Sequence, residues 1–195
     1  MIHPSTRLQF ISQAVGFGVV ATERIPKGTV TWVQDPLDRV FSPDEIRTLP
    51  EAVLPGLDRF TFRNSEGDLV LCWDTARYMN HSCSPTCMGT DYGFELAVRD
   101  ILPGEELSVD YASFHMAEND EFQCLCGAPG CRGFILQKDV TVLADQWSDQ
   151  FLKACSAARS VPQPLLSLFP ANRVPLFLED PSFSWPAGLR SGTGS

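Results

Sequence analysis

Turn signals built from proline and glycine divide the first half of the chain into short segments. The signal at 25–28 stands directly before the β-prone run 29–33, and the signal at 101–105 stands before a second run, 107–111. Proline lacks a backbone donor and glycine accepts turn conformations, so the two together end regular structure and reverse the chain. Because only short strands fit between such turns, the sequence predicts a β-dominated core with short connections.

Three further runs are β-prone, at 15–21, 69–73 and 94–99. The first of them and the run 29–33 flank one short turn, so we expect the two to pair as a hairpin. The run 94–99 alternates apolar and polar residues, which predicts one buried face and one face in water.

Proline spacing leaves room only for short helices in residues 34–68. Ser42 is a good capping residue, Pro43 suits the first helical position and Glu45 can complete a capping box. These residues predict one short helix over about 43–48.

A helical period begins near residue 139. Leu143, Trp147, Phe151 and Cys155 recur at every fourth position and predict one long helix whose apolar stripe docks onto the core. After residue 161, repeated prolines predict an extended tail.

The net charge favours basic partners over nucleic acid. The chain has 15 Lys and Arg against 24 Asp and Glu, a net charge of −9, and this average field repels a polyanion. The longest uncharged apolar stretch, 8–22, has fifteen residues, fewer than the roughly 20 that span a bilayer. We therefore expect no direct nucleic-acid binding and no membrane span, and the oligomeric state stays open.

Seven cysteines without a secretory signal favour a metal site over disulfides. The first residues of the chain lack the basic and apolar regions of such a signal. We expect a reducing compartment, cytoplasmic or nuclear, and leave delivery to a host cell open. Cys124, Cys126 and Cys131 lie within eight residues on a Gly/Pro loop that has no apolar core of its own. Such a loop can wrap a tetrahedral zinc ion, with Zn–S distances of about 2.3 Å.

A structural zinc site is normally closed by four ligands, and this loop supplies three. Cys72 lies on an apolar strand and Cys155 on the helical stripe, so both are interpreted as buried small side chains. Cys83 and Cys87, on a polar stretch, stay open as the fourth ligand, as do the three histidines.

Four motifs resemble, in the same order, those of the SET-domain protein-lysine methyltransferases. They are Gly16-Phe17-Gly18, the run RYMNHSCSP at 77–85, the run GEELSVDY at 104–111, and the cysteine loop, which is similar to the family's post-SET zinc loop. Each motif alone is weak, but four in the family's order are specific. The resemblance covers about residues 8–135.

The resemblance implies a SET-domain fold, mainly β, with small curled sheets, short helices and a post-SET zinc loop. It also implies a knot-like crossing, in which the segment ending at Tyr111 passes beneath a loop near Asn80. Two regions follow from it: a SET domain at 1–115 with a variable insert at about 34–68, and a post-SET zinc loop at 116–136. The helix and the Pro-rich tail predicted above form a C-terminal region at 137–195.

The resemblance also implies a cofactor and site residues. S-adenosyl-L-methionine would bind on one face, and a lysine of a protein or peptide would enter through a channel from the other. Tyr111 would be the catalytic tyrosine, and Cys83 would complete a structural zinc site with Cys124, Cys126 and Cys131. The cofactor-binding residues would be Gly16, Phe17, Gly18, Arg77, Tyr78, Asn80, His81 and Phe134, with Ile135 as the alternative to Phe134 for closing over the nucleotide.

The function that the resemblance implies is methyl transfer to a lysine in a Lys-rich segment such as a histone tail. Two alternatives stay open: a SET enzyme acting on a non-histone protein, and a zinc-stabilised binding module without turnover. The presence of Asn80, His81 and Tyr111 together favours an enzyme. Phe60 and Phe62 stand where relatives often have a channel tyrosine, and Val109 stands where they often have a larger aromatic residue, so the channel lining and the number of methyl groups stay open.

Overall fold

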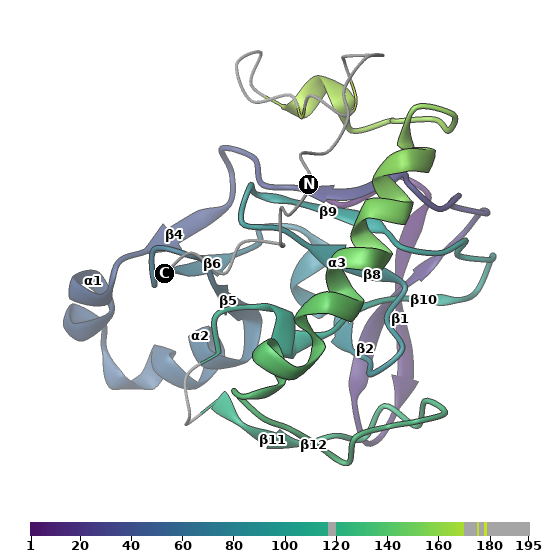
Figure 1. Ribbon diagram of the computed structural model, residues 1–195. Coiled ribbons are helices and arrows are strands. Elements are labelled where there is room, and N and C mark those ends of the chain that lie inside the picture. Colours follow the sequence, from purple (N-terminus) through teal and green to yellow (C-terminus); the bar gives the residue numbers. More distant parts are fainter. Residues whose placement is uncertain (117–119, 170–174, 176–177, 179–195) are drawn as a thin grey trace.

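The computed structural model describes residues 1–116, 120–169, 175 and 178, and small β-sheets form its centre (Figure 1). The largest sheet, in the order β1-β2-β10-β7, consists of β1 (Thr6–Ser12), β2 (Gly16–Ala21), β10 (Glu106–Val109) and β7 (Asn80–His81). The other sheets are β3-β9-β8 (Val30–Val33, Phe94–Ala97, Cys87–Gly89), β4-β6-β5 (Arg39–Phe41, Leu69–Leu71, Thr61–Arg63) and β11-β12 (Phe122–Gln123, Phe134–Ile135). The prediction of a mainly β fold with small sheets is confirmed.

The helices are short apart from α3, which runs along the sheet β3-β9-β8 (Figure 1). The helices whose bounds lie within the described residues are α1 (Pro43–Thr48), α2 (Leu54–Phe60) and α3 (Asp139–Ala158), with 3₁₀ turns η1 (Glu51–Val53), η2 (Thr75–Tyr78), η3 (Tyr111–Ser113) and η5 (Leu166–Leu168). The predicted helix at 43–48 and its capping box are confirmed, as is the long helix. No helix in the described part of the chain has the length and hydropathy of a membrane span. The tail predicted as extended after residue 161 instead forms the turn η5 and buries Leu165 and Phe169 in the core. Beyond residue 169 it lies outside the described residues, except at 175 and 178.

The predicted hairpin between 15–21 and 29–33 is wrong. β2 pairs with β1 and β10, whereas β3 pairs with β9. The backbone groups of Ile25, between the two runs, instead exchange hydrogen bonds of 2.9 Å with those of Ile101. This non-local pairing directs β2 and β3 into different sheets.

β10 joins two distant parts of the chain. It pairs antiparallel with β2 on one side and parallel with β7 on the other, where Ser108 lies opposite Asn80 and Val109 opposite His81. The backbone N–H of Ser82 continues this contact by donating to the Val109 carbonyl at 2.9 Å. The start of η3 therefore lies beside the loop that follows β7.

β9 is buried on both faces, so the prediction that one of its faces is in water is wrong. Phe94 and Leu96 belong to a core cluster that also contains Trp147 and Cys155 of α3. Glu95 points to the opposite face of the strand and is only 7% exposed. The polar position in the alternating pattern is therefore Glu95, whose side chain is enclosed by the protein and does not face water.

Gly28 determines how closely α3 approaches the sheets. Its φ of 89° is left-handed, and a Cβ built on it would lie 2.7 Å from the Ala154 carbonyl oxygen and 2.8 Å from the Ala158 nitrogen. The Gln163 amide also donates to the Gly28 carbonyl at 2.8 Å. The absence of a side chain at Gly28 therefore allows α3 to pack closely against this turn.

Gly28→Ala is expected to lower the free energy of unfolding by about 3 kcal/mol, since the left-handed conformation costs about 1–2 kcal/mol and overpacking about 1–3 kcal/mol. Gly104→Ala is the matched control, because its φ of 83° imposes the same strain but no atom lies within 4 Å of the added carbon. Urea unfolding measures both variants. An equal loss of unfolding free energy in the two variants would contradict the role of Gly28 in the close packing of α3.

Candidate active site and metal centre

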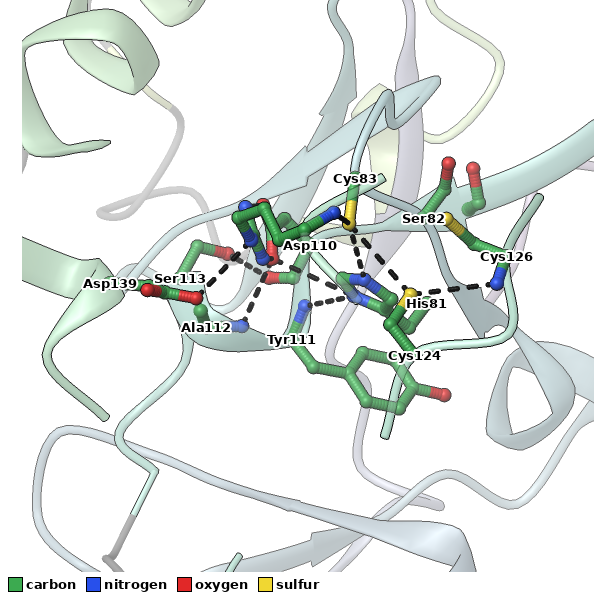
Figure 2. Close-up of polar contacts among 12 residues, drawn as sticks. His81, Ser82, Cys83, Asp110, Tyr111, Ala112, Ser113, Cys124, Cys126 and Asp139 are labelled. Carbon is green, nitrogen blue, oxygen red and sulfur yellow. Dashed lines mark hydrogen bonds and ion pairs between the residues drawn. The ribbon is translucent and has the colours of Figure 1, made fainter. Parts of the chain in front are cut away.

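Tyr111 lies where β10 meets the loop after β7. Its backbone N–H donates to His81 Nδ1 at 3.1 Å (Figure 2). Its hydroxyl donates to the Met79 carbonyl at 2.7 Å. Asn80, next to His81, donates from Nδ2 to the Phe17 carbonyl at 3.0 Å and to the side chain of Glu106 at 2.7 Å. The fold thus brings Tyr111, Asn80 and His81 together.

His81 faces the protein interior. Burial lowers the pKa of His81 to about 4, although Asp110 opposes this shift, so the ring is neutral. Because Nδ1 accepts the Tyr111 N–H, the proton of the neutral ring belongs on Nε2, which lies 3.4 Å from Cys83 Sγ. The side chain is 5% exposed. The imidazole therefore links Tyr111 to Cys83, and only the backbone of His81 is left for an outside ligand.

Four cysteines gather next to His81. Cys83 Sγ lies 3.8 Å from Cys124 Sγ, and these two thiols, the Cys126 thiol and a His81 nitrogen all lie within 4.8 Å of one another. The Cys131 thiol contacts those of Cys124 and Cys126. All seven cysteines are free of disulfides. Cys83 and Cys87 are the two cysteines that the sequence leaves open as the fourth ligand. Cys83 lies close to the loop, whereas Cys87 is fully buried in a second core cluster, which also contains Trp32 and Leu107.

The residues of this cluster fit a zinc ion. The edge of a tetrahedron with Zn–S bonds of about 2.3 Å is about 3.8 Å, which is the separation of Cys83 and Cys124. Backbone N–H groups point at three sulfurs: Arg132 N to Cys83 at 3.4 Å, Cys126 N to Cys124 at 3.5 Å and Gly133 N to Cys131 at 3.5 Å. Burial raises the pKa of Cys83 and of Cys124, whereas at Cys126 backbone hydrogen bonds outweigh burial and lower the pKa to about 7. Such donors stabilise thiolates, the form that binds zinc.

Arg132 ties the cysteine loop to the rest of the site. It donates two hydrogen bonds of 2.7 Å to the buried Asp110 and lies 3.2 Å from Asp139 at the start of α3. The hydrogen bonds to Asp110 raise the pKa of Arg132 still further. Asp110 also accepts from the Ala112 backbone at 3.2 Å. Sequence reasoning did not identify Arg132, because its partners are 22 and 7 residues away and no motif signals them.

Arg132→Met is expected to lower the free energy of unfolding by about 3 kcal/mol, because it leaves two buried carboxylates unpaired. Arg47→Met is the matched control, since Arg47 forms an exposed ion pair with Asp44 and such pairs contribute about 0–1 kcal/mol. Chemical denaturation measures both. A loss for Arg132→Met no larger than the control would mean that the Asp110 pair does not hold the loop.

The other predicted cofactor residues lie on the β2 side of Asn80. Phe17 is 49% exposed, and its ring lies 6.4 Å from that of Tyr78, over which the Arg77 guanidinium sits at 5.4 Å. Gly16 has a left-handed φ of 79°. A Cβ on Gly18 would lie 2.8 Å from Asn80 Nδ2, so this glycine is needed for packing within the protein.

The residues predicted to close over a nucleotide differ in exposure. Phe134 on β12 is 56% exposed, whereas Ile135 is completely buried in the core. Phe134 therefore has a face available for a ligand, and Ile135 has none.

A cavity of about 470 Å³ borders Tyr111. Phe60, Phe62 and Val109, the residues at which the sequence departs from its resemblance, all line it, as does Met79. Burial, followed by the charges of two glutamates, raises the pKa of Tyr111, so the phenol keeps its proton. The cavity thus places a phenol beside apolar side chains, and charged residues such as Glu95 and Arg63 also line it.

Comparison with known proteins identifies the family. The SET domain matches residues 16–112. A histone-lysine N-methyltransferase from Schizosaccharomyces pombe, H3 lysine-4 specific, is 40% identical over 88 residues, which is 40% of this chain and 9% of that protein. The histone-lysine N-methyltransferase trr of Drosophila melanogaster is 32% identical over 133 residues, 62% of this chain and 5% of the other. An H3 lysine-36 specific histone-lysine N-methyltransferase from Mycosarcoma maydis is 30% identical over 160 residues, 76% of this chain and 16% of the other.

The chain spans between 5% and 16% of the length of these three relatives. The matched region contains the motifs at 16–18, 77–85 and 104–111, which the fold brings together at β2, β7 and β10. The chain therefore belongs to the SET-domain family, the family of the histone-lysine N-methyltransferases that it matches.

Proposed function

We propose that this protein transfers a methyl group from S-adenosyl-L-methionine to the side-chain nitrogen of a lysine in a protein. The observation that carries the proposal is the meeting of Tyr111 with Asn80 and His81 at the border of a cavity. The names of the similar proteins support the same reaction.

The proposed substrate is a Lys-rich segment such as the tail of histone H3. The similar proteins are named as specific for lysine 4 or lysine 36 of that histone. The net charge of −9 attracts a basic segment. A histone substrate would place the protein in the nucleus.

The cofactor would be held on the β2 side of the junction. The backbone of Gly16 and Gly18, the rings of Phe17 and Tyr78 and the polar groups of Arg77 and Asn80 are the residues assigned to it. The backbone of His81 and the exposed face of Phe134 complete the set. When bound, S-adenosyl-L-methionine supplies an electrophilic methyl group on a positively charged sulfur.

The residues of the chain have to align the lysine and keep water away. Alignment of two reactants alone contributes about 7–11 kcal/mol. The apolar lining near Tyr111 disfavours an ammonium ion and so favours the neutral amine that attack requires. The protonated phenol of Tyr111 is proposed to orient that amine, and no residue needs to act as a nucleophile.

A structural zinc ion is proposed to hold residues 116–136 against this site. Its ligands are proposed to be Cys83, Cys124, Cys126 and Cys131, with His81 donating to Cys83. Zinc supplies no chemistry in this scheme, since a site closed by four thiolates has no open position. Its role is to fix the loop that carries Arg132.

The test is incubation with S-adenosyl-L-methionine labelled on the methyl group, with core histones and with a cell lysate. We expect label on lysine, identified by mass spectrometry, and about 100-fold less or lower still with Tyr111→Phe. A labelled non-histone protein would identify a different substrate for the same reaction. Absence of label from every protein, in the presence of bound cofactor, would reject the enzyme in favour of a binding module.

A further inference from the structure

Three residues that line the cavity beside Tyr111 each have a buried polar atom without a hydrogen-bond partner among the described residues. These atoms are Oε2 of Glu95, Nε1 of Trp32 and Nε of Arg63. Arg63 is only half-buried and donates through another guanidinium nitrogen, whereas Glu95 and Trp32 are 7% and 3% exposed. An unsatisfied buried donor or acceptor costs about 1–3 kcal/mol. The unsatisfied atoms of Glu95 and Trp32 therefore point to a ligand with a polar end.

The sheet β3-β9-β8 places these side chains together. Glu95 on β9 lies opposite Trp32 on β3 and Gly89 on β8, and directly opposed residues share a face of the sheet. Gly89 has no side chain, and a Cβ there would lie 2.6 Å from the ring of Phe114. Phe62 packs on Trp32 with ring centroids 5.7 Å apart and on Phe114 at 5.2 Å. Glu95 thus faces a space with aromatic walls.

No cation of the described part of the chain pairs with this carboxyl group. Of the arginines lining the cavity, Arg59 and Arg77 are exposed, and Arg63 donates to the Gly67 carbonyl at 3.0 Å. His115 pairs with Asp91 at 2.9 Å. Burial raises the pKa of Glu95 to about 8, and the terminal ammonium only partly offsets it. An incoming cation would favour the ionised form.

We propose that Glu95 receives the substrate side chain while its end is still an ammonium ion and guides it toward Tyr111, where the amine must be neutral before attack, while the Trp32 indole N–H donates to the same carboxylate. This inference rests on the proposed function for the identity of the cation as lysine. Glu95 would select a cationic side chain over an apolar one of the same length. It would be a residue that determines specificity in the part of the cavity where Trp32, Phe62 and Phe114 form the walls.

The test uses two probes of equal length, n-butylammonium and n-butanol, titrated separately into the protein. The readout is the NMR signal of the Trp32 indole N–H, assigned with Trp32→Phe. We expect the ammonium to shift this signal at concentrations at least 10-fold lower than the alcohol. Glu95→Gln, which keeps shape and removes charge, should abolish that preference. Glu66→Gln, an exposed acid that does not line the cavity, should keep it.

The outcomes separate this inference from the proposed function. Equal responses of the wild-type protein to both probes overturn the role of Glu95, whatever the methylation assay reports, and this result does not depend on how Glu95→Gln folds. A preference that persists in folded Glu95→Gln overturns it as well. A preference lost only in Glu95→Gln supports it, even in a protein that transfers no methyl group. In an active enzyme, the same variant should raise the KM for a lysine peptide at least 10-fold.

Discussion

Replacing Tyr111 by phenylalanine is expected to reduce the rate of methyl transfer by about 100- to 1000-fold, the usual effect of removing one preorganised donor from a reaction centre. The hydroxyl is the only group lost. The ring contacts with His81 and Phe122, at centroid distances of 5.5 and 5.9 Å, are retained. The rate is measured in single turnovers with a lysine substrate.

The same variant should bind S-adenosyl-L-methionine with an affinity within about twofold of the wild type, since the cofactor is assigned to residues on the β2 side. Calorimetric titration measures this. Tyr92→Phe is the matched control, because Tyr92 is 79% exposed and should keep full activity. If Tyr111→Phe retains more than a tenth of the rate, the phenol is not the orienting group. If rate and cofactor affinity fall together, its role is structural.

Removal of zinc is expected to lower the melting temperature by about 10 °C or more. Metal binding and folding are coupled in such sites. For a chain of this size, each kcal/mol of unfolding free energy corresponds to about 2–4 °C, so a decrease of 10 °C corresponds to a loss of at least about 3 kcal/mol. The loop has no apolar core to replace the metal. Chelator is added to purified protein, and the melting temperature and metal content are measured together.

Variants identify the zinc ligands. Cys83→Ala and Cys131→Ala should each lose the metal, whereas Cys87→Ala should keep one zinc per chain, because Cys87 lies in the other core cluster. A His81 ring nitrogen lies within 4.8 Å of the thiols of Cys83, Cys124 and Cys126, so the imidazole could itself be a zinc ligand. The variant His81→Gln decides whether it is a ligand or only a hydrogen-bond donor to Cys83. We expect this variant to retain zinc. Wild-type protein without zinc, or zinc kept by Cys83→Ala, would contradict the proposed site.

Local sequence signals predict the elements whose cause is local. The capping residues Ser42 and Glu45 specify α1 through neighbouring atoms, and the stripe on α3 follows directly from helix geometry. Proline–glycine turns likewise limit the strands to short lengths. Strand pairing is different, because Ile25 finds its partner at Ile101. Nothing near residue 25 indicates that choice, and the predicted hairpin failed for this reason.

The residues of the site also fall into two groups, those that the sequence identifies and those whose role depends on the fold. Chemically specialised residues such as Asn80, Cys83 and Tyr111 stand out within motifs, and the fold brings them together. Arg132 and Glu95 do not stand out, because their significance comes from burial. A surface arginine and a buried one look the same in the sequence, and the alternation of β9 does not reveal that both of its faces are covered.

A crystal structure of the protein with S-adenosylhomocysteine and a lysine peptide tests the central claim most directly. We expect the cofactor product on the β2 side near Asn80, the lysine side chain in the cavity lined by Val109, and the sulfur and the lysine nitrogen facing each other beside the Tyr111 hydroxyl. A cofactor bound elsewhere, or a lysine that enters without approaching Tyr111, would contradict the account.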